Sequence, residues 1–177
     1  MLDKRIKKCV VYLDEKEFKT TWLGNKSVYR TRLAMETGGE LIVLAPGVHK
    51  FGEDAGIDVL IRQYGYKTTP EILANLDPDK NPGGAEKAEE LRNNKSCIAH
   101  LIHGSSEGRF KITYCPGHLT REETEGVGFG YGVLADELAK YLPDGNLKDG
   151  WHMVGDEEVF FVSNPAIGLW AYGPDFA

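Results

Sequence analysis

The sequence lacks any apolar run near the roughly 18 residues that a membrane-spanning helix needs. Its first residues carry no apolar segment typical of a secretory signal, so the cytoplasm is the expected location. Cysteine is scarce: Cys9, Cys97 and Cys115 are the only three, and no Cys-x-x-Cys motif is present. An odd number of thiols beside apolar runs argues against a disulfide framework and indicates reduced, buried side chains.

Positive charge is also in short supply. The chain has 21 basic and 27 acidic residues, giving a net charge of -6, and its one dense basic run is residues 4–8. Nucleic acids are bound by dense positive surfaces, so we expect no nucleic-acid partner. We interpret the basic run as a solvated lead-in to the first strand and expect no membrane partner.

What is present is typical of one folded domain. The 177 residues are 41% hydrophobic and 27% charged, enough apolar material for one core and little for two. We therefore expect a single domain over residues 1–177.

Short apolar runs alternate with segments of helical periodicity. The runs predict buried strands at residues 9–13, 41–45, 110–115 and 158–163. Helices are predicted at residues 21–36, 57–64, 69 onward, 85–103, 120–126 and 133–141. This order predicts an α/β three-layer sandwich, with a mainly parallel sheet covered by helices on both faces.

Glycine and proline mark the predicted connections. Gly38 and Gly39 are expected to end the first helix, residues 77–84 to form a mobile loop, and residues 126–132 to form a loop between elements. In parallel sheets ligands collect at the carboxyl ends of strands, which nominates residues 46–54, 116–120 and 164–166.

A lysine falls on the apolar stripe of the first predicted helix. Trp22, Tyr29 and Leu33 share that stripe at 100° per residue, and Lys26 lies among them. Its stem can cover the edge of the core while its ammonium reaches water. Alternatively, the ammonium is presented to an anionic substrate, with Asn25 and Arg30 helping to bind a carboxylate.

Other polar residues suggest weaker candidates. His49 and Lys50 follow the second predicted strand, where they either are simply solvated or place a base and a cation at a cleft. His100, His103, Cys115 and His118 are ligand types for zinc or nickel, but they form no dense motif. We favour structural histidines and assign no metal ligand.

Two segments together resemble a known family: residues 21–26, Thr-Trp-Leu-Gly-Asn-Lys, and residues 38–47, Gly-Gly-Glu-Leu-Ile-Val-Leu-Ala-Pro-Gly. They resemble the C-terminal domain of lactate-racemase-like proteins, the nickel-pincer-nucleotide-dependent 2-hydroxyacid racemases and epimerases. The later order is similar too, with strands that end at Pro116-Gly117 and at Asn164-Pro165.

The resemblance implies a substrate-binding half of an active site. In that family a helix presents an aromatic residue and, four positions later, a lysine, and Trp22 and Lys26 match this spacing. A glutamine commonly follows the aromatic, whereas Leu23 stands here, which favours a hydroxyacid or sugar acid other than lactate. The site residues implied or suggested are Trp22, Asn25, Lys26, Arg30, His49 and Lys50.

The resemblance also implies what must come from elsewhere. The family's nickel-pincer nucleotide and its catalytic histidines belong to an N-terminal domain, which no segment here matches, so no catalytic residue is assigned to this chain. Hydride abstraction and return would then need that domain, fused or separate. An exposed half-cleft also predicts association, including with a second copy. The alternative is a stand-alone domain that binds or senses a small anion without catalysis.

Overall fold

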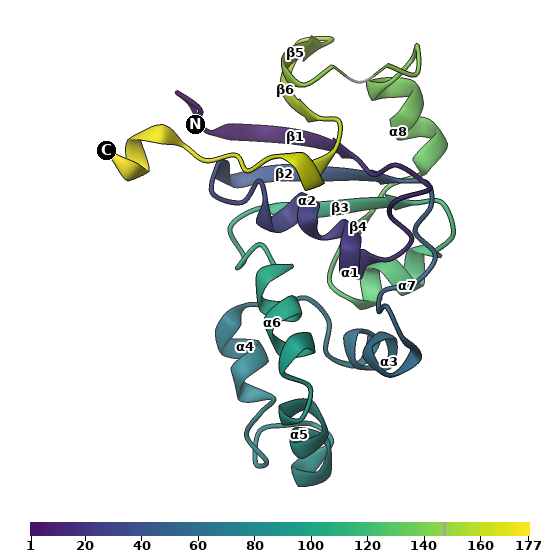
Figure 1. Ribbon diagram of the computed structural model, residues 1–177, viewed down its shortest axis with the longest axis vertical. Coiled ribbons are helices and arrows are strands. Elements are labelled where there is room, and N and C mark those ends of the chain that lie inside the picture. Colours follow the sequence, from purple (N-terminus) through teal and green to yellow (C-terminus); the bar gives the residue numbers. More distant parts are fainter. Residues whose placement is uncertain (147) are drawn as a thin grey trace.

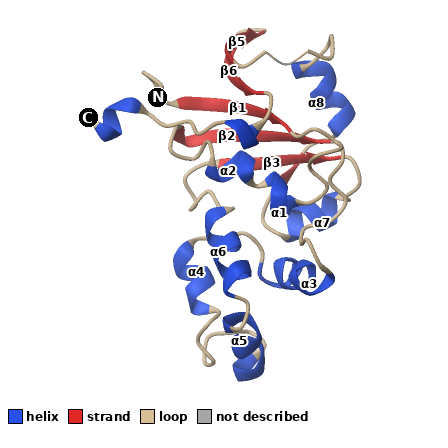
Figure 2. Cartoon of the chain, viewed as in Figure 1, coloured by secondary structure: helices blue, strands red, loops and turns tan. Residues whose placement is uncertain are grey.

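The computed structural model describes residues 1–146 and 148–177. Its centre is a six-stranded sheet in the order β4-β3-β2-β1-β6-β5, in which only β5, at one edge, runs antiparallel (Figures 1 and 2). The strands are β1 (Ile6–Tyr12), β2 (Met35–Ala45), β3 (Lys111–Pro116), β4 (Gly130–Tyr131), β5 (Gly150–Val154) and β6 (Glu157–Val162).

Helices occupy both faces of this sheet. They are α1 (Thr21–Gly24), α2 (Lys26–Tyr29), α3 (Ala55–Tyr64), α4 (Thr69–Ala74), α5 (Gly84–Arg92), α6 (Lys95–His103), α7 (Arg121–Gly126) and α8 (Leu134–Tyr141). Figure 1 shows α4, α5 and α6 extending away from the sheet, whereas α1 and α2 lie against it. In the part of the chain described, no helix is both long and apolar enough to cross a lipid bilayer.

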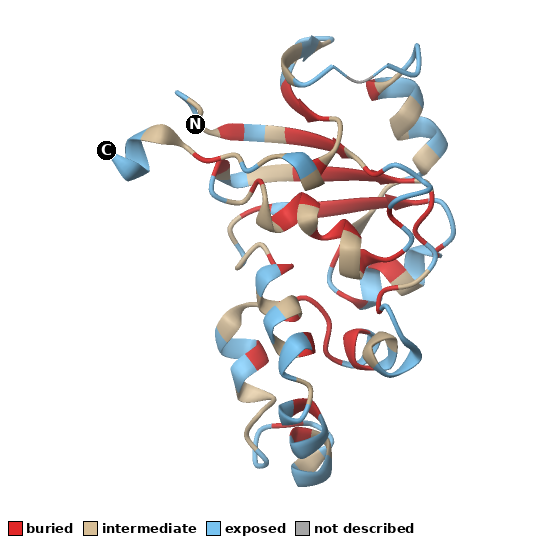
Figure 3. Cartoon of the chain, in the orientation of Figure 1, coloured by how far each residue is buried: buried red, intermediate tan, exposed pale blue. Residues whose placement is uncertain are grey.

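Alternation along the strands divides the core in two. Val11 and Val43 face the larger cluster, which includes Val28 of α2 and Leu101 of α6. Their neighbours on the opposite face join a smaller cluster completed by α8: Val10, Ile42, Leu44, Cys115, Tyr141, Val159 and Phe161. Figure 3 shows the strands as the most continuously buried elements. The α/β class with a mainly parallel sheet is therefore confirmed.

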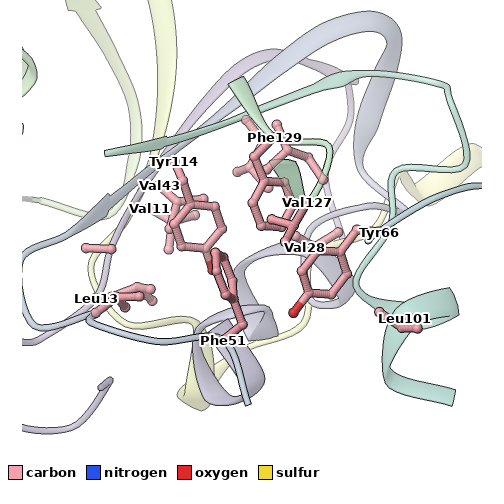
Figure 4. Close-up of a cluster of buried hydrophobic side chains, with 14 of the residues drawn as sticks. Val11, Leu13, Val28, Val43, Phe51, Tyr66, Leu101, Tyr114, Val127 and Phe129 are labelled. Atoms are coloured by element: carbon pink, nitrogen blue, oxygen red, sulfur yellow. The ribbon is translucent and has the colours of Figure 1, made fainter. Parts of the chain in front are cut away.

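Aromatic rings connect the larger cluster to the segment between α3 and α4. Phe129 stacks between Tyr66 and Tyr114, with both pairs of ring centroids 4.7 Å apart (Figure 4). Stacked aromatic pairs add about 0.5–1.5 kcal/mol beyond their area burial. The stack fixes Tyr66 beside α6.

The predicted helix at residues 21–36 is wrong in length. The helical turns end near Ala34, and β2 already begins at Met35, which pairs with Ile6 of β1. Gly38 and Gly39 do not cap a helix but lie within β2, where the pairing with β1 is irregular. Gly38 has a φ of +86°, and a Cβ on Gly39 would lie 2.7 Å from the Lys7 carbonyl oxygen.

Three further features of the fold differ from the sequence prediction: one interrupted helix and two short strands. The helix at residues 85–103 is interrupted at Asn93 and Asn94, whose turn separates α5 from α6. Residues 126–132 contain the short strand β4, and β5 was not predicted. In the segment 77–84 the buried Asn81 amide donates hydrogen bonds to Tyr64 Oη and the Asn75 carbonyl oxygen, at 3.0 and 2.7 Å.

Candidate functional site

Trp22 lies on the short helix α1, and Lys26 is the first residue of the short helix α2. Thr20 caps α1 by accepting a hydrogen bond from the Leu23 amide, and the Trp22 amide donates to the Phe51 carbonyl oxygen at 2.8 Å. Asn25 separates the two helices, so Lys26 follows Trp22 across a turn, and both side chains are half-buried.

Helix α6 faces Trp22 through the side chain of His100. The rings of Trp22 and His100 are tilted, with centroids 4.4 Å apart. His100 Nε2 is hydrogen-bonded to Tyr66 Oη at 2.6 Å, and Tyr66 Oη to Thr21 Oγ1 at 2.9 Å. Burial, reinforced by the nearby His103, lowers the pKa of His100 to about 4. The imidazole beside Trp22 is therefore neutral at physiological pH.

Beside His100 lies an open hollow of about 410 Å³. We call the surface between α1–α2 and α6, including this hollow, the groove. One side comes from α2 and the following turn, and the other from α6. The lining residues are Tyr29, Arg32, Leu33, Ala99, His100 and His103. None of them lies in the loops at the carboxyl ends of the strands that the fold rule nominated, so the hollow is a feature of helix packing.

Asn25 lies inside the protein and joins three elements. Its Oδ1 accepts a hydrogen bond from Tyr114 Oη at 2.7 Å, and its Nδ2 donates to the Gly104 carbonyl oxygen at 3.3 Å. The side chain is fully buried. Both ends of the amide are thus occupied in holding the α1–α2 turn against β3 and the end of α6.

Arg30 follows α2 and is half-buried. Its Nε is buried without a hydrogen-bond partner among the described residues, and its carbonyl oxygen accepts from the Trp170 amide at 2.8 Å. The centre of the guanidinium lies 6.0 Å from the ring of Tyr29. Arg30 therefore adds positive charge to the C-terminal end of α2 without a carboxylate partner.

His49 and Lys50 lie at the start of α1, away from the hollow. The Thr21 amide donates to the Lys50 carbonyl oxygen at 3.2 Å, which brings this loop beside the helix. The Lys50 ammonium donates to the Glu53 carbonyl oxygen at 3.0 Å, and His49 is exposed. The structure thus brings the backbone of this loop close to Trp22, but among the described residues no hydrogen bond or ion pair joins its two side chains to Trp22 or Lys26.

The four potential metal ligands are dispersed. His100 and His103 lie on α6, whereas Cys115 is buried on the opposite face of the sheet beneath α8. His118 is exposed in the loop after β3. Over residues 1–146 and 148–177 no group of three or more His, Cys, Asp or Glu side chains is placed to hold a metal ion. These residues therefore do not fit a nickel centre within this chain.

Helical periodicity in the sequence did not predict all of the residues that form the groove. The sequence prediction treats His100 as a structural histidine or a metal ligand rather than as a partner of Trp22, and it includes neither Tyr66 nor Arg32. The signal for Arg32 was available in the sequence, because it lies close to Lys26 and Arg30 in a segment without acidic residues. The signal for His100 and Tyr66 was not, since their contacts join residues far apart in the chain.

Comparisons with known proteins bear on the fold. No protein-family model matches the chain, and no curated protein matches it in sequence. A Thermotoga maritima protein, solved as a structural-genomics target, superposes with a TM-score of 0.65 and 18% identity, over 93% of this chain and 36% of that chain. The lactate racemase apoprotein from Thermoanaerobacterium thermosaccharolyticum gives 0.51 and 10%, over 95% and 36%.

These likenesses show the fold alone: the chain shares its fold with part of the Thermotoga maritima protein and with part of the lactate racemase apoprotein. At 18% and 10% identity they assign no residue a role. The chain spans 36% of the length of each of the two proteins.

Proposed function

We propose that this chain is the substrate-binding half of a 2-hydroxyacid racemase or epimerase, completed by a cofactor-bearing domain. The observation that carries the proposal is the position of Trp22 of α1 against His100 of α6, with Lys26 following four residues later at the start of α2. An ammonium beside an indole ring suits a carboxylate joined to a carbon skeleton. The fold shared with the lactate racemase apoprotein supports the same assignment.

In this proposal the chain binds and orients, and the chemistry belongs to the other domain. Lys26 holds the substrate carboxylate, while Trp22, fixed by His100, covers one face of the carbon skeleton. The nickel-pincer nucleotide would supply hydride transfer from the other side of the cleft.

Binding to the chain itself tests the proposal. Lactate and 2-hydroxybutyrate are titrated into the ¹⁵N-labelled chain, with an expected Kd of about 1–10 mM because only half of the cleft is present. The Trp22 indole signal and the Lys26 amide should shift. Lys26→Met, which keeps most of the stem, should remove binding, whereas Lys16→Met on the exposed surface should leave it unchanged.

Two results would contradict the proposal. Binding that survives Lys26→Met and shifts only His49 and Lys50 would favour the stand-alone anion-binding domain. No shift at Trp22 or Lys26 with any hydroxyacid at about 100 mM, far above the expected Kd, would remove the substrate-binding role.

A further inference from the structure

The two walls of the groove contain no acidic residue. Residues 18–35, which include α1 and α2, and residues 95–106, which include α6, have neither Asp nor Glu, although the chain as a whole carries a charge of -6. The same segments carry Lys26, Arg30 and Arg32 on one side and His103 on the other. The two segments therefore carry a positive formal charge in an acidic protein, and the neighbouring hollow beyond Leu33 contains Glu36 and Asp175 together with Arg5 and Arg109.

These cations lack carboxylate partners. Over the described residues, Lys26, Arg30 and Arg32 form no ion pair within 4.0 Å, whereas Arg62 pairs with both Asp58 and Glu123. The Arg32 backbone is held in place, because its carbonyl oxygen accepts from Arg109 Nη1 at 3.3 Å. Arg32 lines the hollow, and no carboxylate of the described residues pairs with its guanidinium.

The hollow brings Arg32 and His103 to one space. Arg32 comes from the turn after α2 and His103 from the last turn of α6, and both line the same open volume of about 410 Å³. Between them the surface is formed by Tyr29, Leu33 and Ala99. Apolar walls strengthen the field of a nearby charge, because they exclude the water that would screen it.

We propose that this hollow binds a second acidic group of the substrate, so that the substrate is a dianionic 2-hydroxyacid. The inference rests on the proposed function: the carboxylate next to the carbinol carbon lies at Lys26, and the second group lies between Arg32 and His103. The guanidinium fork of Arg32 donates two parallel hydrogen bonds to the oxygens of a carboxylate or a phosphate. The carbon chain between the two acids lies against Tyr29 and Leu33.

The alternative occupant, an uncharged apolar side chain, fits these residues less well. It would use Tyr29, Leu33 and Ala99 but would bury the Arg32 guanidinium beside apolar atoms without a partner, which is unfavourable. A second anionic group removes this cost. Charge complementarity therefore favours a dianion over a larger neutral side chain.

Titration of the full chain with matched probes tests the inference. Malate and 2-hydroxyglutarate carry a second carboxylate, 3-phosphoglycerate carries a phosphate, and lactate and 2-hydroxybutyrate carry neither. At constant ionic strength we expect the dianions to bind about tenfold to 100-fold more tightly than the monoanions. The better of the carboxylate and phosphate probes identifies the second acid.

A variant series assigns the gain to the hollow. Arg32→Gln should weaken dianion binding about tenfold to 100-fold and leave lactate binding unchanged, since only the second acid contacts residue 32. Arg92→Gln, an exposed cation on α5 far from the groove, is the matched control and should change neither. Circular dichroism of each variant establishes that it is folded.

The outcomes separate this inference from the proposed function. Equal binding of monoanions and dianions at Lys26, unaffected by Arg32→Gln, would overturn the dianionic substrate and leave the carboxylate site intact. Dianion binding that shifts Arg32 and His103 but not Trp22 or Lys26 would support an anion site in the hollow and contradict the proposed function. No dianion binding at about 10 mM would overturn the inference.

Discussion

The ring of Trp22 lies 4.4 Å from the ring of His100, although 78 residues separate them in the sequence. The His100 imidazole is hydrogen-bonded to the Tyr66 hydroxyl, which is also hydrogen-bonded to Thr21, the residue before Trp22. The Trp22 ring and the His100 ring are therefore connected both directly and through Tyr66 and Thr21. Any substitution of His100 should change both the free energy of unfolding of the chain and the position of Trp22.

The lowered pKa of His100 predicts a specific dependence of stability on pH. The imidazole titrates at about 4 in the folded protein, against 6.5 when unperturbed. Between these values the unfolded chain binds more protons, so the free energy of unfolding falls as the pH falls from about 6.5 to about 4. The loss should reach about 3 kcal/mol at the lower end.

Urea unfolding between pH 5 and pH 7 measures this effect with little interference. The pKa values of Asp58, Glu71 and Glu123 are also lowered, but from values of 3.8, 4.5 and 4.5, so these carboxylates act below this window. His100→Gln should flatten the dependence, while His103→Gln, at an exposed position, should retain most of it. Parallel curves for the wild type and His100→Gln would show that the folded pKa is not depressed.

A second prediction concerns the buried pair of Asn25 and Tyr114. The Tyr114 hydroxyl donates to Asn25 Oδ1 at 2.7 Å in a fully buried setting. Asn25→Ala leaves this hydroxyl and the Gly104 carbonyl oxygen without their partner and should cost about 2–4 kcal/mol of stability. Asn146→Ala, at an exposed position, should cost less than about 0.5 kcal/mol.

A double-mutant cycle separates this hydrogen bond from lost packing. Tyr114→Phe and Asn25→Ala together should be less destabilising than the sum of the two single changes, by about 0.5–3 kcal/mol. Strict additivity would mean that the two groups do not interact in solution. If Asn25→Ala were as stable as the wild type, the Asn25 side chain would not be needed for the fold. It would then be available for the substrate-binding role that the sequence suggested.

The four central strands β1, β2, β3 and β6 were predictable from sequence because their signals are local, whereas the edge strands β4 and β5 were not predicted. Each buried strand is a short apolar run closed by a turn residue, and alternation of the strands with helices fixes the class. The capping box Thr120–Glu123 was equally readable: the Glu123 amide donates to Thr120 Oγ1 at 3.1 Å and the Thr120 amide to Glu123 Oε2 at 2.8 Å.

The errors arose where tertiary contacts override local pattern. Helical periodicity continues past Tyr29, but Met35 is needed as a strand partner for Ile6, so β2 displaces the end of the predicted helix. Periodicity predicts Lys26 and Trp22 on one face of a continuous helix, whereas Asn25 divides this segment into α1 and α2. It could not show that the residue beside them, Asn25, is occupied by Tyr114, or that His100 would form the facing wall.

The close approach of α6 to the α1–α2 turn predicts an intolerant glycine. A Cβ on Gly104 would lie 2.5 Å from Asn25 Nδ2 and 2.9 Å from Tyr66 Cε1, closer than packed atoms allow. Gly104→Ala should therefore destabilise the chain by about 1–3 kcal/mol, because neither the buried amide nor the stacked ring can move away freely. It should also move Trp22 relative to His100, since Tyr66 and Asn25 border both walls of the groove.

The matched control is Gly126→Ala at the end of α7. A Cβ there meets nothing within 4 Å, so the change should be neutral or stabilise by up to about 1 kcal/mol. Thermal unfolding compares the two variants, and the Trp22 indole signal reports the groove. If Gly104→Ala were as stable as Gly126→Ala, the two walls would lie further apart in solution than the ring contact between Trp22 and His100 requires.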